Sequence, residues 1–374
     1  MSGERLKVAM FVSNYLPHPG GLEVMVWNLA RGLARRHEVV LVTSAYGGVR
    51  GVSEEDGMTV HRLSAAHVTE RFGVPYPVPM GPGLRSALRD VQGADVVHAH
   101  GALYAQSMLA HAVAHRARTP FVLTEHVGFV GYESGLVNAV QRAAWRAIGD
   151  RMVSGADAVV ALSARVQGWL AQRIRPDVHF VGNGVDSATF RARHADRAAT
   201  RRSFGLPESD TLVLWAGRDS AKKNLGLALA IPRDRFTLVV CGWKRDLTGE
   251  RVLDLGNVPH ERMADLYACA DVLLHTASGE GFPLAVQESV ASGVPVVLLW
   301  DEGYARWLRR DIVAACDEPG DVATQLAVLV DDAPRRATMA AAGRAWAEEH
   351  WSWGATVAAY EEIYCDVIDR ARDR

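Results

Sequence analysis

Ser278-Gly-Glu-Gly-Phe-Pro-Leu-Ala-Val-Gln-Glu-Ser-Val-Ala-Ser-Gly-Val-Pro-Val-Val297 is the stretch that decides how this chain is interpreted. It places Glu280 and Glu288 eight positions apart, and the Gly-Phe-Pro turn after Glu280 predicts the start of a helix. A turn that opens a helix presents free N–H groups and the positive end of the helix dipole. That arrangement suits a phosphate, and the two carboxylates can accept hydrogen bonds from hydroxyls. The stretch therefore predicts a site for a sugar nucleotide.

Apolar runs upstream of this stretch indicate where strands and helices fall in the first half of the chain. They predict strands at 8–12, 39–43, 58–63, 95–99, 120–125, 157–161 and 177–181. Helical patterns separate several of them, at 22–36, 83–92, 102–117, 135–153 and 163–174. Strands that are apolar throughout, with helices between them, predict a parallel sheet covered on both faces.

The same alternation starts again after a turn at Asn183-Gly-Val-Asp186 and an Arg- and Ala-rich linker, which we place near 183–208. Further strands are predicted at 211–217, 236–241, 252–256, 271–275 and 294–299. We therefore expect an α/β protein of two doubly wound, Rossmann-like domains that face a cleft. Ligands of such sheets bind at the carboxyl ends of the strands, and each motif below follows a strand.

Length and composition bound the class of protein. A chain of 374 residues, 49% hydrophobic and 22% charged, suits a two-domain globular enzyme. Its formal net charge of −2 gives no general reason to expect a nucleic-acid partner. None of the four cysteines forms a Cys-x-x-Cys pair, and neither a signal peptide nor an apolar run of about 20 residues is present. We therefore expect a reduced, cytoplasmic protein.

A basic turn follows the first strand of the second domain. Gly217-Arg-Asp-Ser-Ala-Lys-Lys-Asn224 places Arg218 and Lys223 five positions apart across a turn into a helix. Arg offers a forked pair of donors to phosphate oxygens and Lys offers a point charge. Taken alone, the motif would be a solvated basic turn. Next to the Glu280 stretch, it predicts a clamp that stabilises a diphosphate as a leaving group, with Lys222 the poorer candidate.

A glycine pair follows the first strand of the first domain. Gly20 and Gly21 end the loop Asn14-Tyr-Leu-Pro-His-Pro-Gly-Gly21 and let the backbone approach a ligand at the start of a helix. A structural turn would use the same residues. The loop is not a Gly-x-Gly-x-x-Gly motif, which argues against a nicotinamide-dependent dehydrogenase.

Together these motifs resemble those of family 4 glycosyltransferases, which are retaining enzymes of the GT-B fold. The resemblance covers nearly the whole chain and also includes Asp95-Val-Val-His-Ala-His-Gly101, Thr124-Glu-His126 and the Trp-containing C-terminal helix. It implies an acceptor-side domain at 1–185, a donor-binding domain at 186–354, and a final helix, 355–374, that packs back on the first domain.

The resemblance also implies roles for residues in the donor site. Glu280 should contact the hydroxyls of the donor sugar, and Glu288 the hydroxyls of the ribose. Arg218 and Lys223 should bind the diphosphate. The remaining donor contacts that it implies are Gly20, Gly21, Gly217, Gly281, Phe282, Pro283 and Leu284, the last four mainly through their backbone.

Histidines of the first domain complete the implied site. The resemblance places His126 near the reacting sugar as a catalytic residue, together with Glu280, Arg218 and Lys223, although an ordinary core histidine would also fit. His100 and Asn183 are the implied acceptor-side residues. His98 and His100 on one side of a strand invite a metal interpretation, but no third ligand is close in sequence. We therefore expect no metal and no cofactor besides the nucleotide sugar as co-substrate.

The expected reaction is transfer of a sugar from a nucleoside diphosphate, with UDP-sugars favoured, to a hydroxyl of a glycan, a lipid-linked acceptor or a small molecule. The transition state should resemble an oxocarbenium ion. A phosphorylase, a sugar-nucleotide epimerase and a non-catalytic nucleotide-sugar scaffold remain alternatives. The sequence indicates neither the acceptor nor the oligomeric state.

Weak peripheral membrane contact is a further hypothesis. Arg142 and Arg146 lie four positions apart on one face of the helix predicted around 140–151. A packed helix with a solvated edge would show the same spacing.

Overall fold

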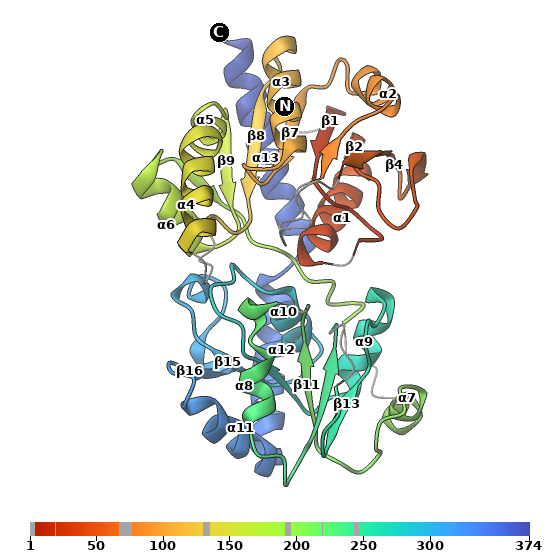
Figure 1. Ribbon diagram of the computed structural model, residues 1–374, viewed down its shortest axis with the longest axis vertical. Coiled ribbons are helices and arrows are strands. Elements are labelled where there is room, and N and C mark those ends of the chain that lie inside the picture. The colour runs from red at the N-terminus through yellow and green to blue at the C-terminus, as the bar shows by residue number, and fades with distance from the viewer. Residues whose placement is uncertain are drawn as a thin grey trace. The chain divides into compact units, whose positions relative to one another are not determined.

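The computed structural model describes residues 4–18, 20–66, 77–129, 135–190, 196–218, 220–242 and 247–374. The chain divides into two compact units (Figure 1). Unit 1 comprises Met1–Gly182 with Trp353–Arg374, and unit 2 comprises Asn183–Ser352. We expect acceptor contacts in the first-domain loops at 67–83 and 127–135, and part of each loop lies outside the described residues.

Unit 1 contains a sheet with the order β10-β9-β8-β7-β1-β2-β4-β3. Its strands are β1 (Lys7–Phe11), β2 (Glu38–Ser44), β3 (Gly51–Glu55), β4 (Met58–Leu63), β7 (Val96–His100), β8 (Phe121–Glu125), β9 (Ala158–Ala161) and β10 (Val178–Phe180). All neighbours are parallel except β3, which pairs antiparallel with β4 at the edge. A separate pair joins β5 (Ala65–Ala66) and β6 (Val78–Pro79). The sequence did not predict β3, because this edge strand is polar and largely exposed.

The helices of unit 1 cover both faces of this sheet. They are α1 (Gly21–Ala34), α2 (Gly83–Asp90), α3 (Ala105–Ala117), α4 (Gly135–Ala144), α5 (Asp150–Ser154), α6 (Ala164–Arg173) and α13 (Trp353–Arg372). Alternate residues of each strand point to opposite faces, so Met10 packs with α1 and α13, whereas Phe11 packs with α3 and α5. The C-terminal helix α13, blue in Figure 1, lies beside α1.

The helix predicted at 135–153 is confirmed, but it is not a regular α-helix over its whole length. A π-helical turn, η2 (Trp145–Gly149), separates α4 from α5. The indole of Trp145 is buried and lies over Gly149, where a Cβ atom would stand 2.1 Å from the ring. The widened turn therefore accommodates a large side chain in the core.

Unit 2 contains a parallel sheet with the order β13-β12-β11-β14-β15-β16. Its strands are β11 (Leu212–Ala216), β12 (Thr237–Cys241), β13 (Val252–Asp254), β14 (Val272–His275), β15 (Val296–Leu299) and β16 (Ala314–Cys316). Its helices are α7 (Arg197–Ser203), α8 (Leu225–Ala230), α9 (His260–Cys269), α10 (Leu284–Ala291), α11 (Asp321–Asp331) and α12 (Ala333–His350), with 3-10 turns η4 (Ala221–Lys223), η5 (Glu302–Tyr304) and η6 (Arg310–Ile312).

Helix α7 lies inside the segment that the sequence predicted as a linker. The Asp196 side chain caps its first turn, and the buried Arg201 on it bonds to Asp271 and to the carbonyl oxygen of Cys269. These bonds to a distant segment stabilise a helix that its Arg- and Ala-rich sequence did not distinguish from a linker.

The strand order of each sheet reverses at its first strand. In unit 1, β1 lies between β2 and β7; in unit 2, β11 lies between β12 and β14. At such a switch point the loops leaving neighbouring strands diverge to opposite faces and leave room for a ligand at the carboxyl ends. Among the described residues, no helix is both long and apolar enough to cross a membrane.

Candidate functional site

The loop after β11 begins with a close backbone contact. Gly242, at the end of β12, has a φ of +84°, and a Cβ atom there would lie 2.6 Å from the carbonyl oxygen of Gly217. Gly217 in turn donates its N–H to the carbonyl oxygen of Cys241. The side chain of Arg218 is exposed, and we find no hydrogen bond or ion pair for it within the described part of the chain. Two glycines therefore bring the strand ends together, and Arg218 remains available to a ligand.

The structure brings Lys223 and Glu280 together. The Nζ atom of Lys223, in η4, lies 2.8 Å from Oε1 and 2.9 Å from Oε2 of Glu280, and both side chains are largely buried. Lys222 instead contributes its carbonyl oxygen, which accepts a hydrogen bond from the N–H of Ser278. The loops after β11 and β14 are thus joined, and their charged groups form one ion pair.

His275, which the sequence analysis missed, is the second neighbour of Glu280. It is buried at the end of β14, and its Nε2 lies 3.2 Å from Oε2 of Glu280. Burial alone would raise the pKa of the Glu280 carboxyl, but His275 and the charge of Lys223 outweigh it and hold this pKa well below its usual range. Burial lowers the pKa of His275. At neutral pH the site therefore contains an ionised Glu280. The one sequence feature that could have indicated His275 is that it is a polar residue at the end of an apolar strand.

The turn after Glu280 leads into α10 as expected, but its side chains face the core. Phe282 is buried, with its ring 6.2 Å from that of Trp307 and 5.3 Å from that of Trp351. Pro283 precedes the first residue of the helix. Over the described residues, the N–H groups of Leu284 and the next residue have no partner. Phe282 can therefore reach a ligand only through its backbone, and the helix start keeps free donors.

Glu288 differs from Glu280 in its charge. It is buried on α10, and the hydroxyl of Tyr267 donates to its Oε2 at 3.1 Å. His260 is more distant, with Nδ1 4.0 Å from Oε1. Burial raises the pKa of Glu288 to about 8, although the hydrogen bond from Tyr267 opposes the rise. The carboxyl is therefore mostly protonated at neutral pH. The eight-residue spacing of the two glutamates could not indicate this difference in charge.

In unit 1, the structure brings His100 and His126 together at the ends of β7 and β8. The Nδ1 atom of His100 lies 3.1 Å from Nε2 of His126. His100 is buried and His126 is partly buried. Burial lowers the pKa of His126 to about 4 and holds the pKa of His100 well below its usual value. Both imidazoles are therefore neutral at neutral pH.

Glu125 holds the loop that carries His126. Its Oε1 accepts hydrogen bonds from the N–H groups of His126, Val127 and Gly128 at 3.1–3.2 Å, and its Oε2 accepts one from Ala102 at 2.8 Å. Such a fully bonded, buried carboxylate fixes a loop conformation. The sequence shows Glu125 between Thr124 and His126, but it could not indicate the hydrogen bonds that Glu125 accepts.

Gly20 and Gly21 lie at the start of α1, but another residue fills the space above them. The carboxylate of Glu23 folds back, so that a Cβ atom on Gly20 would lie 2.2 Å from its Oε2. Its Oε1 lies 2.6 Å from Nδ1 of His18. Glu23 is buried, and its carboxylate occupies the region above the helix start where the sequence predicted a ligand.

Asn183 belongs to unit 2, whereas we had included it in the first domain. Its carbonyl oxygen accepts a hydrogen bond from Nε2 of Gln287 on α10, and its own Oδ1 is buried with no hydrogen-bond partner in the described residues. Asn183 thus contacts the helix that carries Glu288, and its acceptor-side role stays a prediction.

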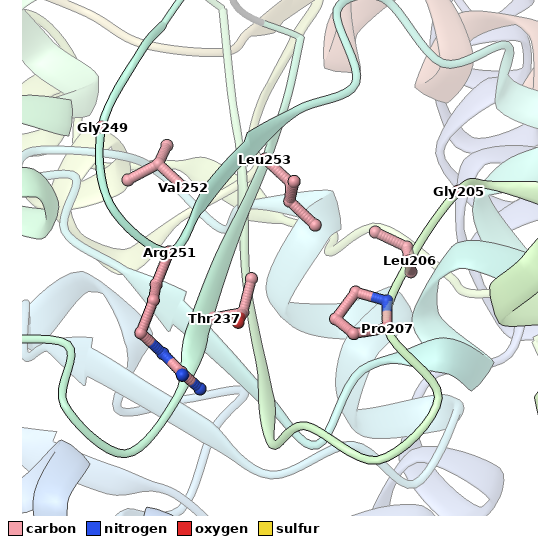
Figure 2. A pocket seen from close by; sticks show the side chains of 8 residues that line it. All are labelled: Gly205, Leu206, Pro207, Thr237, Gly249, Arg251, Val252 and Leu253. Atoms are coloured by element: carbon pink, nitrogen blue, oxygen red, sulfur yellow. The ribbon is translucent and has the colours of Figure 1, made fainter.

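Two other features of the structure bear on where a ligand could bind. No group of three or more His, Cys, Asp or Glu side chains among the described residues could hold a metal ion. Figure 2 shows a pocket of about 550 Å³ in unit 2, lined partly by Leu206, Pro207 and Thr237. Thr237 begins β12, so this pocket lies at the amino ends of the strands, away from the Lys223–Glu280 pair.

Comparison with known proteins gives matches over both halves of the chain. The family described as Glycosyltransferase Family 4 matches residues 19–189, and that described as Glycosyl transferases group 1 matches residues 196–346. A GDP-mannose-dependent alpha-mannosyltransferase of Mycolicibacterium smegmatis is 30% identical over 324 residues, which are 83% of each chain. A D-inositol 3-phosphate glycosyltransferase of Xylanimonas cellulosilytica is 30% identical over 389 residues, covering 94% of this chain and 93% of the relative.

The fold is also that of solved glycosyltransferases. The structure of HepE from Anabaena in complex with UDP-glucose has a TM-score of 0.75 at 19% identity. The match covers 97% of this chain and 100% of that chain. The expected GT-B fold is thereby confirmed.

Proposed function

This chain belongs to the family 4 glycosyltransferases, and from that premise we propose that it transfers a sugar from a nucleoside diphosphate donor to an acceptor hydroxyl with retention of configuration. The observation that carries the proposal is the Lys223–Glu280 ion pair, with 2.8 Å between the charged atoms. In a nucleotide sugar a single bond joins the diphosphate directly to the sugar. The cation that binds the first and the carboxylate that binds the second must therefore be adjacent.

When the donor binds, Lys223 and Glu280 each give up their contact with the other for a contact with the donor. Lys223 turns from Glu280 to a phosphate oxygen, and Arg218 binds a second oxygen through its forked donors. The free N–H groups at the start of α10 add the positive end of the helix dipole. Because the pKa of Glu280 is held low, its carboxylate is ionised and accepts hydrogen bonds from the sugar hydroxyls. These groups stabilise the charge that develops on the departing diphosphate.

Retention follows if the acceptor attacks on the face from which the diphosphate leaves. The bond from the anomeric carbon to the phosphate oxygen breaks as the bond to the acceptor oxygen forms, and a departing phosphate oxygen takes the acceptor proton. Glu280 binds the sugar and is not the nucleophile. Mass spectrometry after rapid quenching tests this step, because a glycosyl adduct on Glu280 would contradict it.

Glu288 is the proposed partner of the ribose hydroxyls. It is neutral near pH 7 with Tyr267 as its bonded neighbour, so it can donate one hydrogen bond and accept another. The sequence favoured a UDP-sugar, whereas the Mycolicibacterium smegmatis relative is named for GDP-mannose. We therefore propose a nucleoside diphosphate sugar as the donor, and UDP-sugars and GDP-mannose are the two donors to compare directly.

Unit 1 is the proposed acceptor side. His126 contacts the reacting sugar, His100 lies toward the acceptor, and Gly20 and Gly21 approach the diphosphate. Asn183 of unit 2 also lies toward the acceptor. For the glycine pair, the carboxylate of Glu23 would have to move from its place above Gly20. The acceptor is a hydroxyl compound, and no metal takes part in the proposed reaction.

Calorimetry tests the donor site first. We would titrate UDP, GDP, ADP and dTDP, each with EDTA, into the wild-type protein and into Arg218→Ala. One nucleotide should bind tightly to the wild type and at least about tenfold more weakly to the variant, since charge-assisted hydrogen bonds contribute about 1.5–3 kcal/mol. Binding of none of the four would contradict the proposed donor site, and binding that requires Mg²⁺ would contradict metal independence.

Product analysis separates the other reactions. A phosphorylase would release sugar phosphate when inorganic phosphate is present, and an epimerase would convert the donor without an acceptor. A non-catalytic scaffold would bind the donor with no turnover. The intact Lys223–Glu280 pair and the exposed Arg218 favour transfer over a scaffold.

A specific surface supports the hypothesis of weak membrane contact. Leu136 and Val140 on α4 are 75% and 61% exposed, and they lie four positions apart. Arg142 and Arg146, also exposed, follow them along the same helical segment. Apolar side chains beside cations are suited to a membrane with anionic headgroups.

Cosedimentation with vesicles tests this contact. The protein should pellet with vesicles that contain an anionic phospholipid and less with purely zwitterionic ones, and Leu136→Asp should reduce the bound fraction. Absence of the protein from the anionic pellet would reject the membrane contact without affecting the donor site.

A further inference from the structure

A continuous chain of hydrogen bonds joins the C-terminal helix to the sheet of unit 1. The hydroxyl of Tyr364 lies 2.7 Å from Nδ1 of His98, and Nε2 of His98 lies 2.8 Å from Oγ1 of Thr124. The hydroxyl of Tyr360 lies 3.0 Å from the same Oγ1 atom. All four side chains are buried. Both ring nitrogens of His98 are therefore bonded, and the imidazole cannot turn without breaking a buried hydrogen bond.

The His98 ring packs against the ring of His100, which is one member of the His100–His126 pair. The rings of His98 and His100 are 4.3 Å apart between centroids, on the same strand, and tilted by 42°. The His100 ring must keep its orientation for its Nδ1 to reach Nε2 of His126 at 3.1 Å. A fixed His98 ring therefore restricts the rotation of His100.

The position of the protons follows from which atoms have partners. All three imidazoles are neutral, because burial lowers the pKa of each one. Nε2 of His100 is buried and has no hydrogen-bond partner among the described residues. Buried N–H groups without an acceptor are rarer than buried acceptors without a donor. The proton of His100 is therefore on Nδ1 and is donated to Nε2 of His126, which leaves the proton of His126 on its own Nδ1.

We propose that Tyr364, His98 and Thr124 are positioning residues, which hold His100 so that His126 presents Nδ1–H as a hydrogen-bond donor to the substrate. This inference rests on the proposed function for the role of His126, but the proton position can be measured without turnover. A donor of fixed position adds to catalysis only if it is aligned before the substrate arrives.

A matched pair of variants at Thr124 separates positioning from packing. Thr124→Val keeps the shape of the side chain and removes the hydroxyl, whereas Thr124→Ser keeps the hydroxyl and removes a buried methyl group. If the residue only fills space, Ser should be the more damaging change. If it positions His98, Val should lower kcat about tenfold, equivalent to about one net hydrogen bond, with a smaller change in the donor KM, and Ser should retain most of kcat.

Tyr364→Phe is the second test, because it removes only the hydroxyl bonded to His98. It should lower kcat in the same direction as Thr124→Val. Tyr360→Phe, which removes a hydroxyl one bond further from His98, should have the smaller effect.

NMR of protein labelled with ¹⁵N in the histidine rings reports the protonated nitrogen directly, with His126→Gln used for assignment. The wild type should show His126 as the Nδ1–H form, and Thr124→Val should show a mixture or the Nε2–H form. An Nε2–H form in the wild type would overturn the inference, as would Thr124→Val with unchanged NMR signals and unchanged kcat. If no sugar transfer is found in any assay, the proposed function fails, while the NMR result still decides the proton position.

Discussion

Replacing Lys223 with Ala is the sharpest test of the donor site, because the structure shows which groups its side chain contacts. Its Nζ contacts both carboxylate oxygens of Glu280, and the two side chains are 20% and 14% exposed. At the 2.8 Å separation of this pair, opposite charges attract by about 6 kcal/mol in an effective dielectric of about 20. The hydration that both groups lose offsets most of this. Lys223→Ala should therefore lower the free energy of unfolding by about 1–2 kcal/mol.

The loss of activity should be larger than the loss of stability. A group that stabilises developing charge in the transition state contributes about 10²–10³-fold to kcat. We expect Lys223→Ala to reduce kcat by about that factor, measured as release of nucleoside diphosphate with excess donor and acceptor. Its Tm should fall by about 2–4 °C for each kcal/mol lost in a unit of this size. Calorimetry should show weaker binding of the nucleoside diphosphate.

Lys222→Ala is the matched control, since it removes the same charge from the same turn one residue earlier. The backbone carbonyl that accepts from Ser278 is retained in this variant. It should keep the wild-type kcat. Wild-type kcat in Lys223→Ala, or a greater loss in Lys222→Ala than in Lys223→Ala, would refute the assignment of the clamp.

Three further predictions concern neighbouring groups. Burial raises the pKa of Glu288 to about 8, so between about pH 5 and 8 the folded state binds more protons than the unfolded state. The stability that this carboxyl contributes is fully present below its unfolded pKa and falls as the pH rises through that window. Thermal unfolding should therefore show a weaker decline of Tm with pH for Glu288→Gln than for the wild type. Gly242 has a φ of +84°, and a Cβ atom there would lie 2.6 Å from the carbonyl oxygen of Gly217, so Gly242→Ala should lose about 1–3 kcal/mol of stability and bind nucleotide more weakly. Gly226→Ala places its Cβ in open space within α8 and should be at least as stable as the wild type in the same melting assay. Glu125→Gln replaces one acceptor oxygen by an NH₂ group facing backbone N–H donors, so it should lose about 2–3 kcal/mol and speed hydrogen exchange at residues 126–128; unchanged exchange would contradict its role in holding that loop.

Most of the fold could be predicted because parallel strands buried on both faces are apolar throughout. The runs at 39–43 and 58–63 lie within β2 and β4, and the run at 271–275 contains β14. The elements that the sequence analysis missed depend on their surroundings. Strand β3 is polar and forms by pairing with β4, and α7 is held by the bonds of Arg201 to a distant segment.

The sequence by itself determined where charged and glycine residues follow strands, because a motif of a few residues sets its own turn and its place at a strand end. Arg218, Lys223 and Glu280 could be named for that reason. Only the tertiary structure decided which groups meet: Lys223 pairs with Glu280 across 57 positions, and Tyr364 meets His98 across 266. It also decided that Glu280 is ionised while Glu288 is neutral. Charge state and hydrogen-bond partners depend on burial and on segments far apart in the chain, and neither is encoded in the spacing of one motif.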